Sequence, residues 1–426
     1  MLNMQARLFW ALLTVLIALS IYLIDASLQL MVCVLFIYIL IAFILERSYW
    51  GILYLNVLIN IAFLALANWF TDGKISFLED ETFIPYYKQA LLLEIMFWVS
   101  FTVLSGFKKN LGQPPDMLDR QSKHFPPFLL LVAAVVLFSL ELGLNSGKYF
   151  IPYTEESNTG TVGYELGCVL LALGVIMRGS RSPSVVKFMI EMLGVGLSFF
   201  IMVGSGKRLP FSYIILAYSI LGLNNYGKAR TTIVYVFIAI AGWAYGIFRD
   251  SFTLSDLNSI VFAKAFESTN QGAVLHASGV YLRVIDEGLI TWLDSAISFF
   301  GNFIGSLIIP ISLLPEQVQV NIFAMNYYPI QGNGGFIGAY SFFFLRWMGP
   351  ILISWIFVCL CSGRSYWMKL VGFIILLTST RWTLYNIGPI GRLISMTVIV
   401  FMIIELGYKL LLSRPRKVSS VDPNLL

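Results

Sequence analysis

Charged side chains are scarce in this chain: Asp, Glu, Lys and Arg together make up 12% of its 426 residues. A soluble globular domain carries about 25% charged residues and about 45–50% apolar ones. Here the apolar share is 58%, and runs long enough to cross roughly 30 Å of hydrocarbon recur along the whole length. The composition excludes an ordinary soluble protein and predicts an all-α integral membrane protein.

Cysteine and histidine are also few, with four and two residues. The cysteines lie in or beside apolar runs and lack the spacing of zinc, redox or disulfide motifs. No cofactor or metal site is expected. The net charge of +5 is small and lies mainly in loops and the tail, which fits membrane topology better than a nucleic-acid partner.

Apolar windows bounded by turn-forming residues predict about twelve membrane-spanning helices. They cover residues 8–24, 28–45, 51–70, 90–107, 127–144, 161–177, 188–204, 209–224, 231–248, 337–361, 370–387 and 391–412. The first run lacks a convincing small-residue cleavage site, so it predicts an uncleaved helix. The predicted regions are nine helices in 1–248, a large segment in 249–335, three helices in 336–412 and a tail in 413–426.

Basic residues gather in the segments that would face the cytoplasm if the N-terminus lies inside. They cluster at 108–123 and 409–417, whereas the loop at 71–88 is net acidic. The positive-inside rule therefore predicts that both termini are cytoplasmic and that 249–335 lies on the outer side. If the apolar stretch at 292–315 crossed the membrane, the basic loop and tail that follow it would lie on the outer side, against the positive-inside rule. The stretch therefore predicts an interfacial or re-entrant helix.

Several basic residues depart from this rule because they lie at membrane depth near the outer ends of predicted helices. An arginine at the membrane centre costs at least about 2.5–3.5 kcal/mol, although one near a helix end can extend its head to the interface. Snorkelling explains any single residue, but a shared anion such as pyrophosphate explains the set better, because guanidinium groups bind phosphate oxygens in pairs. The candidates for substrate binding are Lys207, Arg208, Arg249, Arg283, Arg346, Arg381 and Arg392.

The stretch GSGKR ends in Lys207 and Arg208. It is not a phosphate loop, because the first glycine and the final Ser or Thr of that motif are missing. Gly204 and Gly206 instead predict a break and tight turn after one helix, and Pro210 predicts the first turn of the next. The two basic residues would then lie at a helix N-terminus, where N–H groups and the helix dipole attract an anion.

Two more stretches carry unusual patterns. In GNGGFIGAYSFFFLRWMG, residues 332–349, the glycines predict a flexible lead-in to an aromatic helix that contains Tyr340. Its aromatic residues are typical of an interfacial belt, or of a groove for lipid and sugar. In TSTRWTLYNIGPIGRLI, residues 378–394, the GPIG sequence predicts a turn that directs Arg381 and Arg392 toward the outer face.

With these three stretches, the chain resembles the oligosaccharide repeat-unit polymerases of Gram-negative surface polysaccharides, the O-antigen or Wzy-type polymerases. In that family a Gly- and Ser-containing turn with an arginine opens a helix, and a large periplasmic segment follows. A Gly-rich lead-in then begins a helix of the form G-x-x-x-E-x-Y-x-N-F-G. The present chain keeps the glycines, Tyr340 and the aromatic character, but it has Gly338 or Ala339 where the Glu belongs. The resemblance implies a scaffold similar to the GT-C-type glycosyltransferases, shared with O-antigen ligases, in the bacterial inner membrane.

The resemblance also implies a reaction at the periplasmic face: a growing glycan moves from undecaprenyl pyrophosphate to the terminal sugar of a lipid-linked repeat unit. Fixed arginines would stabilise the leaving pyrophosphate without a metal. The acceptor hydroxyl needs a general base, and the outer-segment candidates are Asp250, His276, Asp286 and Glu287. The implied partners are the undecaprenyl-pyrophosphate-linked oligosaccharide and membrane lipid, and a contact with a polysaccharide chain-length regulator stays open.

Two other functions also stay open. An O-antigen ligase uses the same donor but transfers the glycan to lipid A core, and a glycine seven or eight residues after a histidine would be its sign. His276 has no such glycine. A lipid-linked oligosaccharide flippase or transporter should show two related halves and cationic residues along a lumen. The chain shows no internal repeat, and its one large outer segment follows the ninth predicted helix.

Overall fold

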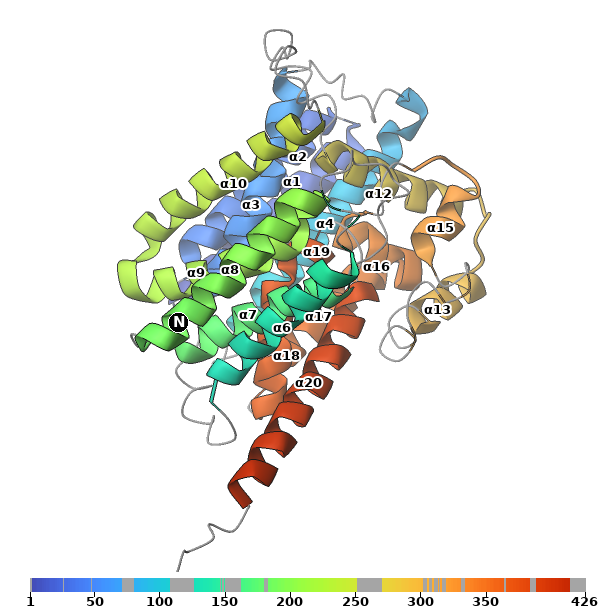
Figure 1. Cartoon of the computed structure of the whole chain (residues 1–426). Helices are drawn as coiled ribbons and strands as arrows, with labels where there is room; N and C mark the ends of the chain where they lie inside the picture. The colour runs from blue at the N-terminus through green and yellow to red at the C-terminus, as the bar shows by residue number, and fades with distance from the viewer. Residues whose placement is uncertain are drawn as a thin grey trace, which may run out of the picture.

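The computed structural model of the chain is helical throughout the part that it describes, and no strand occurs there (Figure 1). The described residues are 2–25, 27–46, 48–70, 80–107, 126–145, 162–179, 183–250, 270–301, 319–330, 334–363, 365–383 and 388–413, with 147, 149, 305, 309, 313 and 315. An all-helical fold satisfies backbone N–H and C=O groups within each segment, which a hydrocarbon environment requires.

The elements are α1 (Leu2–Leu23), α2 (Leu28–Leu45), α3 (Gly51–Phe70), the 3₁₀ turn η1 (Glu81–Phe83), α4 (Ile84–Gly106), α6 (Phe128–Leu144), α7 (Val162–Arg178), α8 (Val185–Ser205), α9 (Arg208–Tyr226), α10 (Lys228–Asp250), α12 (Asn270–Asp286), α13 (Trp292–Phe300), α15 (Val320–Met325), α16 (Ile337–Leu345), the 3₁₀ turn η8 (Arg346–Met348), α17 (Gly349–Cys361), α18 (Tyr366–Leu377), α19 (Ser379–Trp382) and α20 (Gly388–Ser413). Each span predicted from the sequence overlaps a helix or a broken pair of helices in this set.

Six helical stretches in the described part of the chain are long and apolar enough to cross a membrane. They are Met4–Leu23, Leu28–Leu45, Glu81–Gly106, Val185–Ser205, Ile337–Cys361 and Ile390–Leu411. Shorter apolar helices accompany them, among them most of α3, α6, α9 and α18. The prediction of an all-α membrane protein is confirmed at this level.

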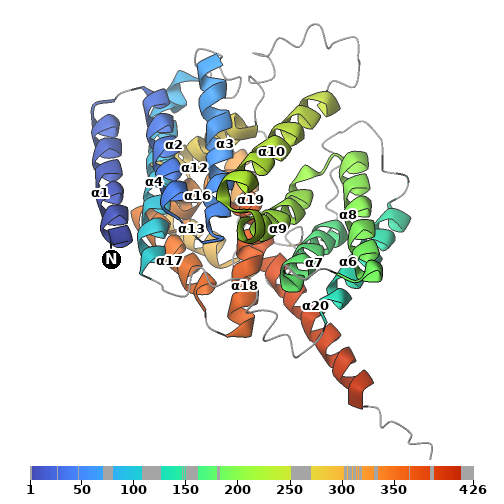
Figure 2. The same ribbon diagram turned by 90° about the vertical axis from the view of Figure 1, so that its left-hand side faces the viewer.

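The helices form two groups that meet around α19 (Figure 2). In one group α4 packs against α1, α2, α12, α16 and α17; in the other α7 packs against α6, α8, α9 and α20. Helix α19 packs against α3 of the first group and against α9 of the second. A four-residue helix therefore lies where the two halves of the bundle join.

Polar contacts define two ends of the bundle. At one end, Arg7 near the start of α1 pairs with Glu46, which follows α2, at 2.7 Å. The ammonium of Lys228, at the start of α10, donates to carbonyls at the end of α2, including that of Glu46 at 2.9 Å. At the other end, Arg208 at the start of α9 donates to the carbonyl of Gly242 in the second half of α10. We call these the Arg7 end and the Arg208 end.

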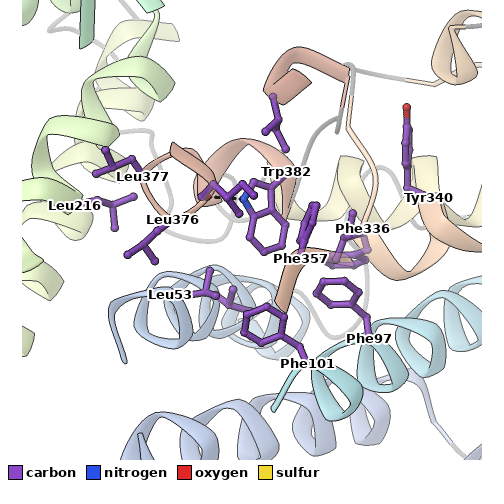
Figure 3. Close-up of a cluster of buried hydrophobic side chains, with 14 of the residues drawn as sticks. Leu53, Phe97, Phe101, Leu216, Phe336, Tyr340, Phe357, Leu376, Leu377 and Trp382 are labelled. Atoms are coloured by element: carbon purple, nitrogen blue, oxygen red, sulfur yellow. Dashed lines mark hydrogen bonds between the residues drawn. The ribbon is translucent and has the colours of Figure 1, made fainter. Parts of the chain in front are cut away.

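The apolar core surrounds the indole of Trp382 on α19 (Figure 3). Phe357 packs edge-on against this ring with a centroid distance of 4.8 Å, and Trp98 stacks on it at 6.1 Å. The indole N–H donates to the carbonyl of Ile375 at 2.8 Å, so the polar edge of the buried ring is satisfied. This packing fixes α19 against α4, α17 and α18.

Three local predictions need correction. Gly204 stays inside α8, and Gly206 alone makes the turn before α9, with φ of 70°. The tenth predicted span is broken at Arg346, where φ is 52°, a backbone conformation that costs a non-glycine residue of order 1–3 kcal/mol. The GPIG sequence lies within the first turn of α20, because Gly388 already has helical geometry; residues 384–387 lie outside the described part.

Helix α13 covers part of the stretch expected to be interfacial. Its inward residues Ser295 and Ser298 are fully buried, whereas Trp292, Leu293 and Phe300 are exposed. The N-terminus has a capping box in which Thr291 and Asp294 exchange hydrogen bonds. Apolar side chains outward and small polar ones inward are the arrangement expected of a helix that faces lipid, so the interfacial interpretation fits the described residues.

Candidate functional site

The start of α9 presents the basic pair that the sequence singled out. Gly206 ends α8 in the left-handed conformation, Lys207 is the N-cap residue of α9, and Arg208 is its first residue. Arg208 donates to the carbonyl of Gly242 at 3.0 Å, which ties α9 to α10. The predicted helix start is confirmed, and both side chains lie at its positive end.

Helix α19 holds three consecutive polar residues, each in polar contact with a different helix. Ser379 accepts from the Asn56 amide of α3 at 3.4 Å. The hydroxyls of Thr380 and Ser212, on α9, lie 2.8 Å apart. The next residue, Arg381, places Nε 3.8 Å from the carboxylate of Glu165 on α7. Three helices therefore fix the position of Arg381.

These contacts bring two of the three sequence stretches together at the Arg208 end. We call the group the α9–α19 cluster; its residues are Glu165, Lys207, Arg208, Ser212, Tyr213, Thr380 and Arg381. Ser212 lies one helical turn after Arg208, and its bond to Thr380 joins the GSGKR helix start to the TSTRW segment. The arrangement can bind an anion, since it combines a helix N-terminus with fixed guanidinium groups.

A second set of candidates lies on α12, where His276 bonds through both ring nitrogens. Its Nδ1 lies 2.8 Å from the Tyr87 hydroxyl, and its Nε2 lies 3.1 Å from the Pro329 carbonyl. A carbonyl only accepts, so Nε2 carries the proton and Nδ1 accepts from Tyr87. Burial lowers the pKa of His276, which favours this neutral form. Its assignment as general base stays a prediction that requires one of these bonds to open.

The remaining α12 candidates form an exposed network of their own. Arg283 pairs with Glu287 at 2.8 Å, and its guanidinium lies over the rings of Phe83 and Tyr328, within 4.5 Å of each centroid. The Tyr328 hydroxyl and Arg283 lower the pKa of Glu287, so this carboxylate is ionised at neutral pH. Asp286 accepts from the Tyr86 hydroxyl at 2.9 Å. We call these residues, with His276, the α12 cluster.

Tyr340 is buried in α16 and packs edge-on against Tyr281 of α12, at a centroid distance of 6.2 Å. The resemblance expects a Glu one or two residues before Tyr340, where this chain has Ala339 and Gly338. A carboxylate from another helix, that of Glu94 on α4, lies beside Gly338. This carboxylate accepts the backbone N–H of Gly338 at 2.8 Å and the Trp98 indole N–H at 2.7 Å. A Cβ on Gly338 would lie 2.4 Å from the Leu93 carbonyl carbon, so the close approach of α4 and α16 requires glycine.

The other candidates lie apart from these groups or outside the described side chains. Arg346 donates to Ser295 of α13 and to the Phe343 carbonyl, at the break between α16 and α17. Arg392 is half-buried in the first turns of α20 and has no hydrogen bond or ion pair with any described residue. Arg249 and Asp250 end α10, and their side chains are not among those described.

Sequence reasoning missed the acid beside Arg381. Glu165 lies in the first turn of α7, accepts from the Tyr213 hydroxyl at 2.8 Å and is the ion-pair partner of Arg381. A signal existed, because ionisable residues inside apolar helices are costly and often functional. Within the described part of the chain, no three His, Cys, Asp or Glu side chains gather in a way that could hold a metal ion.

Comparisons with protein-family models, with curated proteins and with solved structures found no match to this chain.

Proposed function

We propose that this chain is a glycosyltransferase that polymerises undecaprenyl-pyrophosphate-linked oligosaccharide repeat units at the periplasmic face of the bacterial inner membrane. One observation carries the proposal: Arg381 is held by three helices beside the α9 N-terminus, which presents Lys207 and Arg208. Such a group of fixed cations within an apolar bundle suits a lipid whose head is a pyrophosphate.

The reaction needs charge stabilisation at one place and proton removal at another. The acceptor hydroxyl oxygen attacks the anomeric carbon of the polymer, and the bond from that carbon to the pyrophosphate oxygen breaks. Its electron pair stays on the pyrophosphate, whose negative charge grows in the transition state. Arg208 and Arg381 would stabilise that charge from fixed positions. The hydroxyl proton passes to a general base, for which the α12 cluster supplies His276, Asp286 and Glu287.

The complete scaffold that we propose has about twelve membrane-spanning helices and one large periplasmic segment, similar to the GT-C-type glycosyltransferases. Arg249, Arg283, Tyr340, Arg346 and Arg392 complete the proposed substrate-binding set. The position of Arg208 at the end of the bundle opposite Arg7 and Lys228 supports a site on the outer side of the membrane.

The test is the glycan that a deletion strain makes. Loss of a polymerase leaves surface lipid capped with single repeat units, and the wild-type gene should restore long chains. A strain that instead accumulates long lipid-linked polymer would identify a ligase. A strain that retains repeat units on the cytoplasmic side would identify a flippase or transporter, and either result would overturn the proposal.

The proposed topology places both termini and the loop at 108–126 in the cytoplasm, and residues 249–335 in the periplasm. Single cysteines at Ser122 and Ser268, in a background without the four native cysteines, test it with a membrane-impermeant thiol reagent. We expect label at position 268 in intact spheroplasts and at position 122 only after lysis, because basic loops stay inside. Label at position 122 in intact spheroplasts would contradict this topology.

A further inference from the structure

The contact between Arg381 and Glu165 differs from the other arginine–glutamate pairs of the described chain. Its closest atoms, Nε and Oε1, are 3.8 Å apart, whereas Arg7–Glu46 and Arg283–Glu287 lie at 2.7 and 2.8 Å. An N–H···O hydrogen bond needs about 2.7–3.2 Å, so this pair interacts through charge alone at these atoms. The acid therefore attracts the guanidinium electrostatically, and no hydrogen bond joins these two atoms.

Glu165 is itself held firmly. The Tyr213 hydroxyl donates to Oε1 at 2.8 Å, and the Tyr213 side chain is fully buried in α9. The acid side chain is 18% exposed and that of Arg381 is 30% exposed, so the pair lies at the boundary between the bundle and its surroundings. Buried Tyr213 therefore holds the carboxylate of Glu165, and this carboxylate lies next to the partly exposed side chain of Arg381.

A matched arrangement lies elsewhere, on α7, α8 and α9. Tyr218, also on α9, donates to Glu191 at 2.7 Å, and Arg178 bonds to this acid at 3.1 Å. There the arginine closes fully onto the acid, and Glu191 is almost completely buried. The arginine is therefore within hydrogen-bond distance of the acid in the Glu191 group and beyond it in the Glu165 group.

We infer that Glu165, fixed by Tyr213, is a positioning residue that orients the Arg381 guanidinium toward the leaving pyrophosphate. This rests on the proposed function. A misplacement of about 1 Å in a catalytic group can cost roughly 100-fold in rate. At the same time the Glu165 charge repels a bound pyrophosphate, so it contributes nothing to substrate affinity. Loss of the Glu165 charge should therefore lower kcat and should not raise KM.

Glu165→Gln is the decisive variant, because glutamine keeps the size and can still accept from Tyr213 while it removes the charge. We expect kcat to fall about 10- to 100-fold with KM equal to or below the wild-type value. Tyr213→Phe should lower kcat less, and Tyr218→Phe, the matched control, should leave both constants unchanged. The rates are measured on the purified full chain in lipid nanodiscs, with repeat units extracted from the deletion strain.

A double-mutant cycle keeps this inference separate from the proposed function. If Glu165 acts through Arg381, the pair Glu165→Gln with Arg381→Ala should be no slower than Arg381→Ala alone. If the double variant loses kcat by the product of the two single losses, Glu165 acts independently of Arg381 and the positioning role is overturned. An unchanged kcat in Glu165→Gln beside a defective Arg381→Ala would overturn it as well. Both outcomes leave the polymerase proposal standing. An active Arg381→Ala would overturn the role of Arg381 and with it the positioning role of Glu165, whereas a wild-type chain that does not extend the repeat units would overturn the proposed function. Thermal stability of each variant excludes misfolding as the cause of a loss.

Discussion

Arg381→Ala is expected to abolish polymer while the protein still accumulates in the membrane. Helix α19 is fixed by the contacts of Ser379 to α3 and of Thr380 to α9, and the Arg381 side chain itself contacts Glu165 on α7. Removing one such preorganised charge stabiliser typically costs about 100- to 1,000-fold in rate. Its neighbour Thr380 keeps the bond to Ser212, so the helix should stay in place. The measurement is glycan length on gels from a deletion strain that expresses the variant.

Arg392→Ala should have the same effect, because this half-buried arginine lies in the first turns of α20 and its side chain is paired with no described residue. The controls are Arg414→Ala and Arg416→Ala, which remove equal charge from the tail outside the described residues and should leave long chains. Essential tail arginines beside dispensable Arg381 and Arg392 would place the site on the opposite side of the membrane.

Helix positions could be predicted from the sequence because hydrocarbon imposes a length and a composition on each segment. The turn before α9 was predictable for a local reason, since Gly206 supplies the positive φ that other residues avoid. The break at Arg346 was missed although Gly349 and Pro350 follow it at the start of α17, because a proline in the first turn of a helix was not taken as a sign that a new helix begins there. That break depends on how α13 and α17 pack around α16, where Arg346 bonds to Ser295.

The candidate site was predictable only in part, because basic residues were weighed and their partners were not. Arg381 was identified by its charge, but Glu165 and Thr380 read as ordinary members of apolar runs. Their importance comes from pairing across helices that are distant in sequence, and no spacing along the chain indicates it. On α12 one pair could have been predicted from spacing but was not: Arg283 and Glu287 are four residues apart, which places them on one helix face.

Arg208→Lys is expected to lower polymerase activity roughly 10- to 150-fold although the charge is kept. The planar fork that meets two phosphate oxygens is lost, and bonds of this charge-assisted kind contribute about 1.5–3 kcal/mol each. A transition-state loss of that size gives the stated fall in rate. A lysine can still donate one hydrogen bond toward the carbonyl of Gly242, which keeps the contact between α9 and α10. A loss of activity would therefore report on phosphate recognition by the guanidinium group.

Lys207 provides the comparison within the same helix start. It is the N-cap residue, and its ammonium acts as a point charge, so Lys207→Ala should cost less than Arg208→Ala and Lys207→Arg should be tolerated. Polymer length and initial rate are measured for all four variants at matched membrane levels. A fully active Arg208→Lys would rule out bidentate phosphate recognition. Lys207 and Arg208 would then be ordinary basic residues at a helix end, whose side chains extend to the membrane interface. Arg381 would be left as the residue that binds the anion.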